Sequence, residues 1–187
     1  MLKERGIITI IVCCTFFITL VSAAAAATET ADNMFVCDLE VNKVGPKPAD
    51  TIANGNVIFL LDEEKNELSY KIHVEDIEDV YMAHLHMGPS KKEGIIATWL
   101  YPVDEHDSEN RTIEGEFTGT LAEGVIRQED LKHGITLEEI IESLGNGNSY
   151  VSVHTKNFVM GAVRGQVYLE GLASQMEKNP TAAGNNQ

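Results

Sequence analysis

Short segments of alternating polarity, separated by residues that favour turns, most constrain what this chain can fold into. In one of them Leu68, Tyr70 and Ile72 share a face, because side chains alternate between the two faces of a strand. Polar residues 62–66 lie between two such runs and predict a hairpin over 56–75. The whole pattern predicts strands near 34–43, 56–62, 67–75, 79–87, 94–101, 111–120, 149–156 and 162–170.

One segment has helical periodicity instead. Thr136 and Glu139 have the spacing of a capping box, in which each residue satisfies a backbone amide of the first helical turn. Leu137, Ile140 and Leu144 repeat at the interval of one helix face. The chain is therefore predicted to be mainly β: a Greek-key β-sandwich of about eight antiparallel strands with one short inserted helix.

Residues 1–27 have the organisation of a cleavable secretory signal peptide. Lys3 and Arg5 precede an almost unbroken apolar stretch over 7–21, and the small residues of 22–27 offer A-x-A cleavage sites. The apolar stretch is about 15 residues long, shorter than the roughly 20 that a spanning helix needs. We therefore expect a secreted or cell-surface protein, with a retained membrane anchor as the alternative.

About 160 residues remain after such a cut, which is enough for one domain with a hydrophobic core. We expect a domain over 34–171 and a disordered tail over 172–187, which lacks an apolar pattern. The chain has 29 acidic residues against 14 Lys and Arg, a net charge of −15. This acidic surface argues against nucleic acid or an anionic membrane as a partner, and leaves a protein or a metal ion. The oligomeric state cannot be predicted.

Two isolated residues carry smaller predictions. Cys37 is the only cysteine that remains after the predicted signal, so an internal disulfide is not possible. Its apolar neighbours indicate a small buried hydrophobic side chain. Asn110 begins an Asn-x-Thr glycosylation sequon, which matters only in a eukaryotic secretory route.

Three motifs, in this order, resemble the CHRD (chordin-type) domain. They are Ala-His-x-His-x-Gly-Pro over 83–89, Gly-Asn-x-Tyr-Val-x-Val-His-Thr over 147–155, and Gly-x-x-Arg-Gly-Gln over 161–166. The resemblance covers about 34–170 and implies a β-sandwich domain of extracellular proteins. In chordin the surrounding protein binds secreted growth factors, but no activity follows for a single domain, because a fold does not fix a function.

The histidines of these motifs form a candidate site. His84 and His86 occupy positions i and i+2 of a predicted strand, so they share one face about 7 Å apart. His154 and Arg164 lie on the polar faces of two later strands. If these strands adjoin, the four side chains converge on one polar patch.

Such a patch is open to several interpretations. The three imidazoles of His84, His86 and His154 can bind a copper or zinc ion and leave one coordination position open. Such a site would lose its metal as the imidazoles protonate, near pH 6–7. Copper/zinc superoxide dismutases combine a His-x-His strand with an arginine, although no bridging histidine or zinc loop is evident here. The histidines can instead fasten loops, and Arg164 can pair with a carboxylate or attract an anion. With no nucleophile motif in the sequence, we expect a non-enzymatic binding or structural module. The alternative is a copper- or zinc-binding protein with a three-histidine site, with or without superoxide dismutase-like activity.

Overall fold

A computed structural model describes residues 33–45, 48–102 and 111–172 of the chain. The predicted signal peptide, the sequon residue Asn110 and the tail from 173 lie outside these residues. Within the described ranges no helix is long and apolar enough to cross a membrane. The elements are β1 (Met34–Val41), β2 (Asn54–Asp62), β3 (Glu67–Met87), β4 (Ile95–Tyr101), β5 (Ile113–Ile126), the 3₁₀ turn η2 (Gln128–Asp130), α2 (Leu137–Gly145), β6 (Ser149–Thr155), β7 (Val163–Gln166) and β8 (Tyr168–Leu169).

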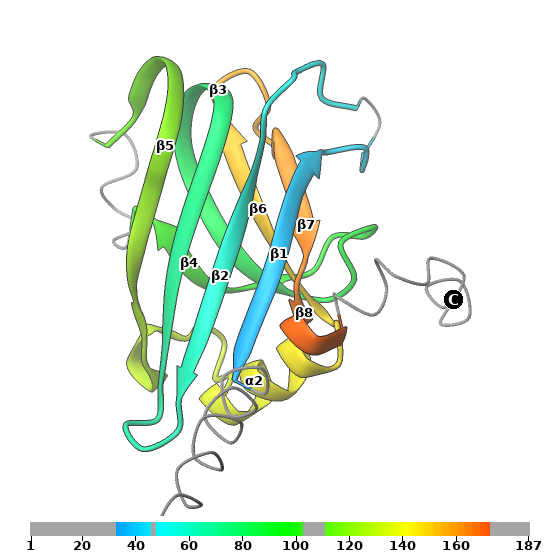
Figure 1. Cartoon of the computed structure of the whole chain (residues 1–187). Coiled ribbons are helices and arrows are strands. Elements are labelled where there is room, and N and C mark those ends of the chain that lie inside the picture. Colours follow the sequence, from blue (N-terminus) through cyan, green and yellow to red (C-terminus); the bar gives the residue numbers. More distant parts are fainter. Residues whose placement is uncertain (1–32, 46–47, 103–110, 173–187) are drawn as a thin grey trace, which may run out of the picture.

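The long strand β3 organises the sheet (Figure 1). Val80 pairs with Ile113 of β5 and with Thr155 of β6, so these two strands lie on opposite edges of β3. By the same reasoning β2 and β6 follow one another along one edge, and β5 and β4 along the other. The pairings β6–β7, β7–β1 and β1–β2 then complete a circuit back to β3, all of them antiparallel.

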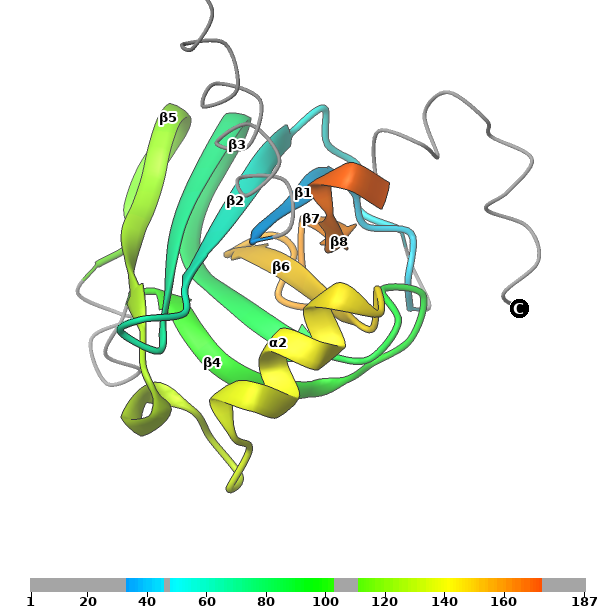
Figure 2. The ribbon, with the colours of Figure 1, turned by 60° about the horizontal axis from the view of Figure 1, so that its bottom comes forward.

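The expected fold class, mainly β with antiparallel strands and one short helix, is confirmed. Because the strand circuit closes, the sheet is barrel-like, an arrangement with which the predicted sandwich is compatible. Figure 2 shows the ring of strands end-on, with α2 lying across one opening. The predicted hairpin over 56–75 is confirmed by the β2–β3 pairing, which begins at Asp62 and Glu67.

Two predicted strands, 67–75 and 79–87, are wrong as separate elements, because β3 runs through both. Asp76 and Asp79 take left-handed conformations, with φ of 51° and 52°, and the pairing with β5 shifts register at each of them. Asp is one of the few non-glycine residues that adopts this conformation readily, so these turn-like residues make bulges instead of ending the strand.

Apolar side chains from both sides of the circuit fill the interior. Leu85 and Val151 are fully buried there, and Cys37 is buried with them, as predicted. Burial also raises the pKa of the Cys37 thiol. The predicted capping box forms between Thr136 and Glu139 and starts α2, whose apolar face closes the core.

Candidate functional site

The predicted polar patch forms on the face of β3, β6 and β7 that points away from the core. Met82 lies opposite His154, and His84 lies opposite Ser152, which in turn pairs with Arg164 of β7. A register shift between Val80 and Met82 skips one residue of β3. This bulge lets Val80 point into the core while Met82 and His84, which are two residues apart, share the outer face.

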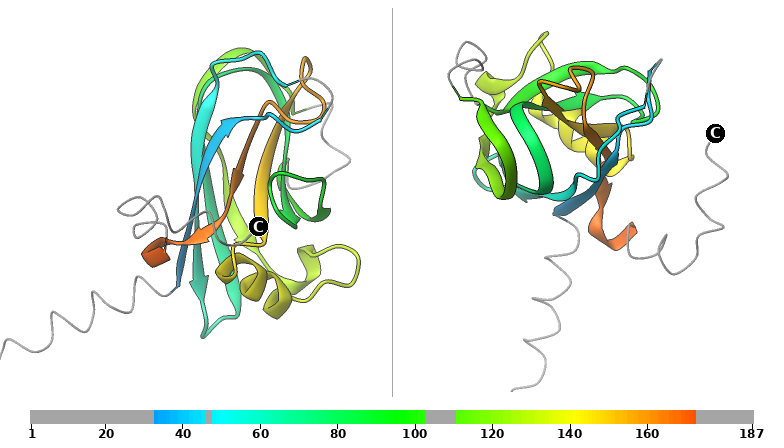
Figure 3. Two further views of the ribbon diagram at one scale, coloured as in Figure 1. Left: turned by 90° about the vertical axis from the view of Figure 1, so that its right-hand side faces the viewer. Right: turned by 90° about the horizontal axis from the view of Figure 1, so that it is seen from above.

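The patch is buried although it lies outside the barrel. The exposed fractions of His84, His86 and His154 are only 3%, 5% and 8%. Residues 88–94, which connect β3 to β4, and residues 156–161, which connect β6 to β7, cover it through the contacts described below. Figure 3 shows the green β3–β4 connection on the outer side of β6 and β7, away from β1 and β2.

The three imidazoles converge. Each histidine offers a ring nitrogen, and these three nitrogens all lie within 4.8 Å of one another. The ring centroids of His84 and His154 are 5.0 Å apart, and those of His84 and His86 are 5.7 Å apart. The convergence expected from the sequence is therefore present, with ligand atoms from two strands, β3 and β6.

Hydrogen bonds fix which nitrogens are free. The Nδ1–H of His86 donates to the carbonyl of Gly94 at 3.2 Å, and the Nδ1–H of His154 donates to the carbonyl of Val159 at 2.9 Å. A neutral imidazole that donates through Nδ1 has a lone pair on Nε2. Both Nε2 atoms, and both ring nitrogens of His84, are buried without a hydrogen-bond partner in the protein.

This cluster holds most of the buried polar atoms that lack a partner. Across the described residues there are seven such side-chain atoms, and six of them are here. Besides the four histidine nitrogens they are Oγ of Ser152 and Nε of Arg164. Leaving one such group unsatisfied costs about 1–3 kcal/mol, so six of them at one place need partners that the described protein side chains and backbone do not supply.

The electrostatics keep the imidazoles neutral. Burial, with a smaller electrostatic contribution from its two histidine neighbours, lowers the pKa of His84 to about 3. Burial lowers the pKa of His86 to about 4 and also lowers that of His154, with Arg164 adding to both effects. Neutral imidazole is the form that binds a metal ion.

Arg164 connects the site to its cover. Its side chain is 3% exposed and makes an ion pair with Glu93 at 3.0 Å. It also donates to the carbonyls of Ser90 and Lys92, and its guanidinium carbon lies 4.6 Å from the centre of the Tyr150 ring. The pairing with a carboxylate, which the sequence left open, is therefore present, and it ties the β3–β4 connection to β7.

Two aromatic residues belong to the site that were not proposed as site residues from the sequence. Tyr150 stacks on His86 with 4.5 Å between ring centres, and Trp99 of β4 meets His84 edge-on at 4.4 Å. The alternation of β6 already placed Tyr150 and Ser152 on the face of His154. Trp99 carried no such signal, because its position opposite His84 depends on a register shift between β3 and β4.

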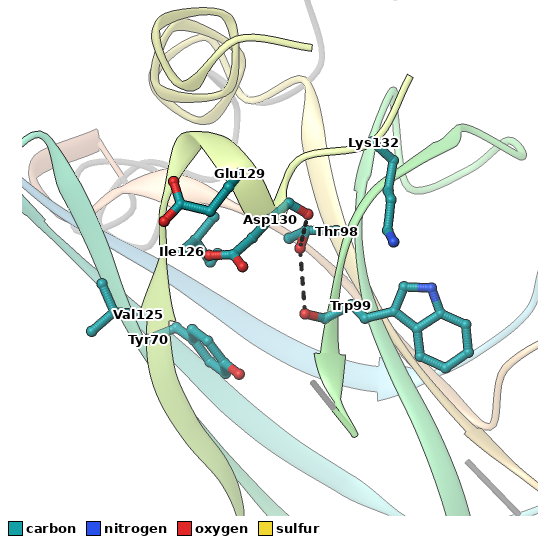
Figure 4. Close-up of a pocket in the computed structure, with 8 residues that line it drawn as sticks. All are labelled: Tyr70, Thr98, Trp99, Val125, Ile126, Glu129, Asp130 and Lys132. Atoms are coloured by element: carbon teal, nitrogen blue, oxygen red, sulfur yellow. Dashed lines mark hydrogen bonds between the residues drawn. The ribbon is translucent and has the colours of Figure 1, made fainter. Parts of the chain in front are cut away.

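A second concave region lies on the other side of β4 (Figure 4). It is a surface pocket lined by Tyr70, Thr98, Trp99, Val125, Ile126, Glu129, Asp130 and Lys132. The Tyr70 hydroxyl donates to the carbonyl of Leu100, and the Thr98 hydroxyl donates to that of Asp130. None of the lining residues is among the described side chains with a buried unpartnered atom. The histidine cluster is therefore the stronger candidate.

The geometry of the cluster fits a metal ion. Three nitrogens bound about 2.0–2.1 Å from a trigonal or tetrahedral ion lie about 3.3–3.6 Å apart. The histidine nitrogens, which lie within 4.8 Å of one another, are close to that spacing. The carbonyls bonded to Nδ1 of His86 and His154 are the outer partners that metal-binding histidines usually have. Imidazole ligands suit copper and zinc.

Comparison with known proteins identifies the family. Neither the curated proteins nor the solved structures compared with this chain gave a match. The family model of the CHRD domain matches residues 35–167, which include all three histidines and Arg164. The match covers well over half of the chain, in agreement with the resemblance of its three motifs. The chain belongs to the CHRD domain family.

Proposed function

We propose that this chain is an exported, non-enzymatic binding module whose ligand is a copper or zinc ion held by His84, His86 and His154. One observation carries the proposal: each histidine has a buried ring nitrogen without a hydrogen-bond partner, and the three residues offer ring nitrogens within 4.8 Å of one another. The proposal takes up the alternative expected from the sequence, a copper- or zinc-binding protein with a three-histidine site.

A purely structural role accounts for less. It explains why His86 and His154 donate to loop carbonyls, since those bonds hold the two covering connections in place. It does not explain His84, which has no hydrogen bond from either nitrogen although both are buried. A leucine there would hold the strands together without burying polar atoms, so the imidazole favours a ligand.

Export is the second part of the proposal. CHRD domains are typically found in extracellular proteins. The basic, apolar and small-residue segments of 1–27 support the same location. We expect the mature N-terminus near residue 28, which N-terminal sequencing of protein from the culture medium will check.

Elemental analysis tests the metal site. The full chain, purified without a histidine tag, is expected to contain about one copper or zinc ion, and His86→Ala to contain almost none. His73→Ala is the matched control, because His73 also lies on β3 but is half-exposed and outside the cluster. Equal metal content in the wild type and His86→Ala would refute the assignment.

The single tryptophan gives an independent measurement. Trp99 is the only tryptophan of the chain, and its ring contacts His84. Titration with Cu²⁺ is expected to quench its fluorescence at one equivalent in the wild type and in His73→Ala. Quenching that needs a large excess of Cu²⁺, or that is unchanged in His84→Ala, would place the ion elsewhere.

The lowered pKa values also revise the expected pH dependence of metal binding. Ligands with ordinary pKa values would lose metal near pH 6–7, but His84 and His86 have pKa values of about 3 and about 4. Proton competition is therefore expected to begin roughly two pH units lower. Measurement of metal content after dialysis at pH 7, 5.5 and 4 checks this.

A further inference from the structure

A bound metal ion satisfies only half of the unpartnered atoms in the cluster. It takes one nitrogen from each histidine, and three groups remain: the second nitrogen of His84, Oγ of Ser152 and Nε of Arg164. A neutral imidazole that binds a metal through one nitrogen carries its proton on the other. All three remaining groups therefore have a hydrogen to donate. The free N–H of His84 lies on the far side of its ring from the ion, so an acceptor bound to the ion is left to Ser152 and Arg164.

These three donors lie in one row across adjacent strands. Ser152 of β6 pairs directly with His84 of β3 on one side and with Arg164 of β7 on the other. Side chains directly opposite in an antiparallel pair have Cβ atoms about 4.5–5.5 Å apart. His154, two residues beyond Ser152, shares its face, so the hydroxyl lies beside both the row and the metal position.

The row is closed from solvent. Ser152 is fully buried, and a Cβ placed on Gly161 would come within 2.5 Å of its hydroxyl oxygen, so the β6–β7 connection lies directly against it. Arg164 is buried beside it, and its partner Glu93 is half-exposed at the rim. The buried side of the guanidinium therefore has hydrogen-bonding capacity that Glu93 does not use.

The charge of the site points to the same kind of ligand. A divalent ion held by three neutral imidazoles beside Arg164 places three positive charges against the single carboxylate of Glu93. Arg164 already acts electrostatically on His86 and His154. A small anion bound next to the ion offsets part of this charge in a place where solvent cannot.

We propose that the metal centre takes a small monoanion as an additional ligand, held by the Ser152 hydroxyl and Arg164 Nε. This inference rests on the proposed metal site and assigns its remaining position to an anion of the size of a halide or azide. Arg164 then has two roles, since it holds the β3–β4 connection through its terminal nitrogens and the anion through Nε.

Azide titration of the copper-loaded full chain tests the proposal. Metal content is measured first, and sodium azide is then added while the azide-to-copper charge-transfer absorption is recorded. We expect one saturable azide per copper. Ser152→Ala is expected to weaken azide about 5-fold or more and Arg164→Gln about 10-fold or more, the losses typical of a neutral and a charged hydrogen bond. Arg127→Gln, which removes an exposed charge paired with Glu67, is the control and should bind azide as the wild type does.

The outcomes separate the two proposals. A protein with no metal at the histidines refutes the proposed function and this inference with it. A protein with copper but no saturable azide, or with equal azide affinity in the wild type and Ser152→Ala, refutes the anion position alone and leaves water as its occupant. Ser152→Ala decides the matter even if Arg164→Gln does not fold, because the serine makes no hydrogen bond that holds the covering segments.

Binding linkage gives a second measurement. If azide and copper share the site, azide must raise the affinity for copper by the factor by which copper raises that for azide. Competition for copper with a chelator, with and without azide, is expected to show this gain in the wild type and a smaller one in Ser152→Ala. A gain of equal size in both proteins would contradict the proposal.

Discussion

Where β3 runs beside β6, the two faces of these strands are both buried and are chemically opposite. Leu85 and Val151 point into the barrel and are fully enclosed by other apolar side chains. His84, His86 and His154 point outward and are almost as inaccessible, but they carry four nitrogens without a partner. The same two strands therefore support an ordinary core on one side and an unsatisfied polar cluster on the other.

The difference lies in what covers each face. The inner face is covered by the opposite strands and by α2. The outer face is covered by the connections 88–94 and 156–161, held by bonds to His86, His154 and Arg164. Burial of the inner face drives folding, since apolar surface leaves water. Burial of the outer face without a ligand opposes it, since the polar groups lose water and gain nothing.

The inner face is where truncation is expected to cost most. Leu85→Ala should lower the free energy of unfolding by about 2–5 kcal/mol, the range for leucine truncation in a packed core. Urea unfolding of the metal-free protein measures it. A cost below about 1 kcal/mol would mean that the inner face is not the packed core that the strand circuit indicates.

The outer face is expected to dominate the pH dependence of stability. The pKa values of His84 and His86 in the folded protein, about 3 and about 4, lie below the unfolded value of about 6.5. The unfolded chain therefore binds more protons between about pH 3 and 6.5, and stability falls as the pH falls through that window. From pH 7 to pH 5 each histidine should cost about 2 kcal/mol.

The double variant His84→Leu/His86→Leu isolates this effect. Its carboxylates are those of the wild type, so the difference between the two proteins reports the histidines alone. Unfolding of both metal-free proteins in urea at pH 7, 6 and 5 should give a shallower slope for the variant. Parallel curves would show that the two imidazoles protonate normally and are not enclosed.

The two faces also differ in how far the sequence could predict them. Alternation alone predicted that His84 and Leu85 point to opposite faces of the sheet, because successive side chains of a strand do so whatever the strand pairs with. The burial of His84 was not predictable, since it depends on two connections folding back over the sheet. Trp99 was missed for a related reason, because a bulge sets its register. The family motifs singled out the three histidines, but their convergence was predicted only on the condition that their strands adjoin, which the β3–β6 pairing meets.

The cover of the outer face has its own weak point at Gly161. Its φ is +103°, and a Cβ there would lie 2.5 Å from Ser152 Oγ. Gly161→Ala should therefore destabilise the protein by about 1–3 kcal/mol, because a side chain is strained in that conformation and also meets the hydroxyl. Gly145→Ala is the control, since nothing lies within 4 Å of its Cβ position at the end of α2. The control should be neutral or gain up to about 1 kcal/mol in the helix. Equal losses in the two variants would mean that the cover does not press on the site.

The smallest expected change in stability is a gain, whereas the other changes are losses. His84→Leu replaces two unpartnered nitrogens by apolar atoms of similar volume, so the metal-free protein should become more stable, by about 1 kcal/mol, at pH 7. The same variant should no longer bind copper or zinc, and added metal, which stabilises the wild type by binding only its folded form, should leave the variant unchanged. Urea unfolding with and without metal measures both. A loss of stability in His84→Leu would show that the imidazole stabilises the fold. The outer face would then have a structural role, as the inner face has.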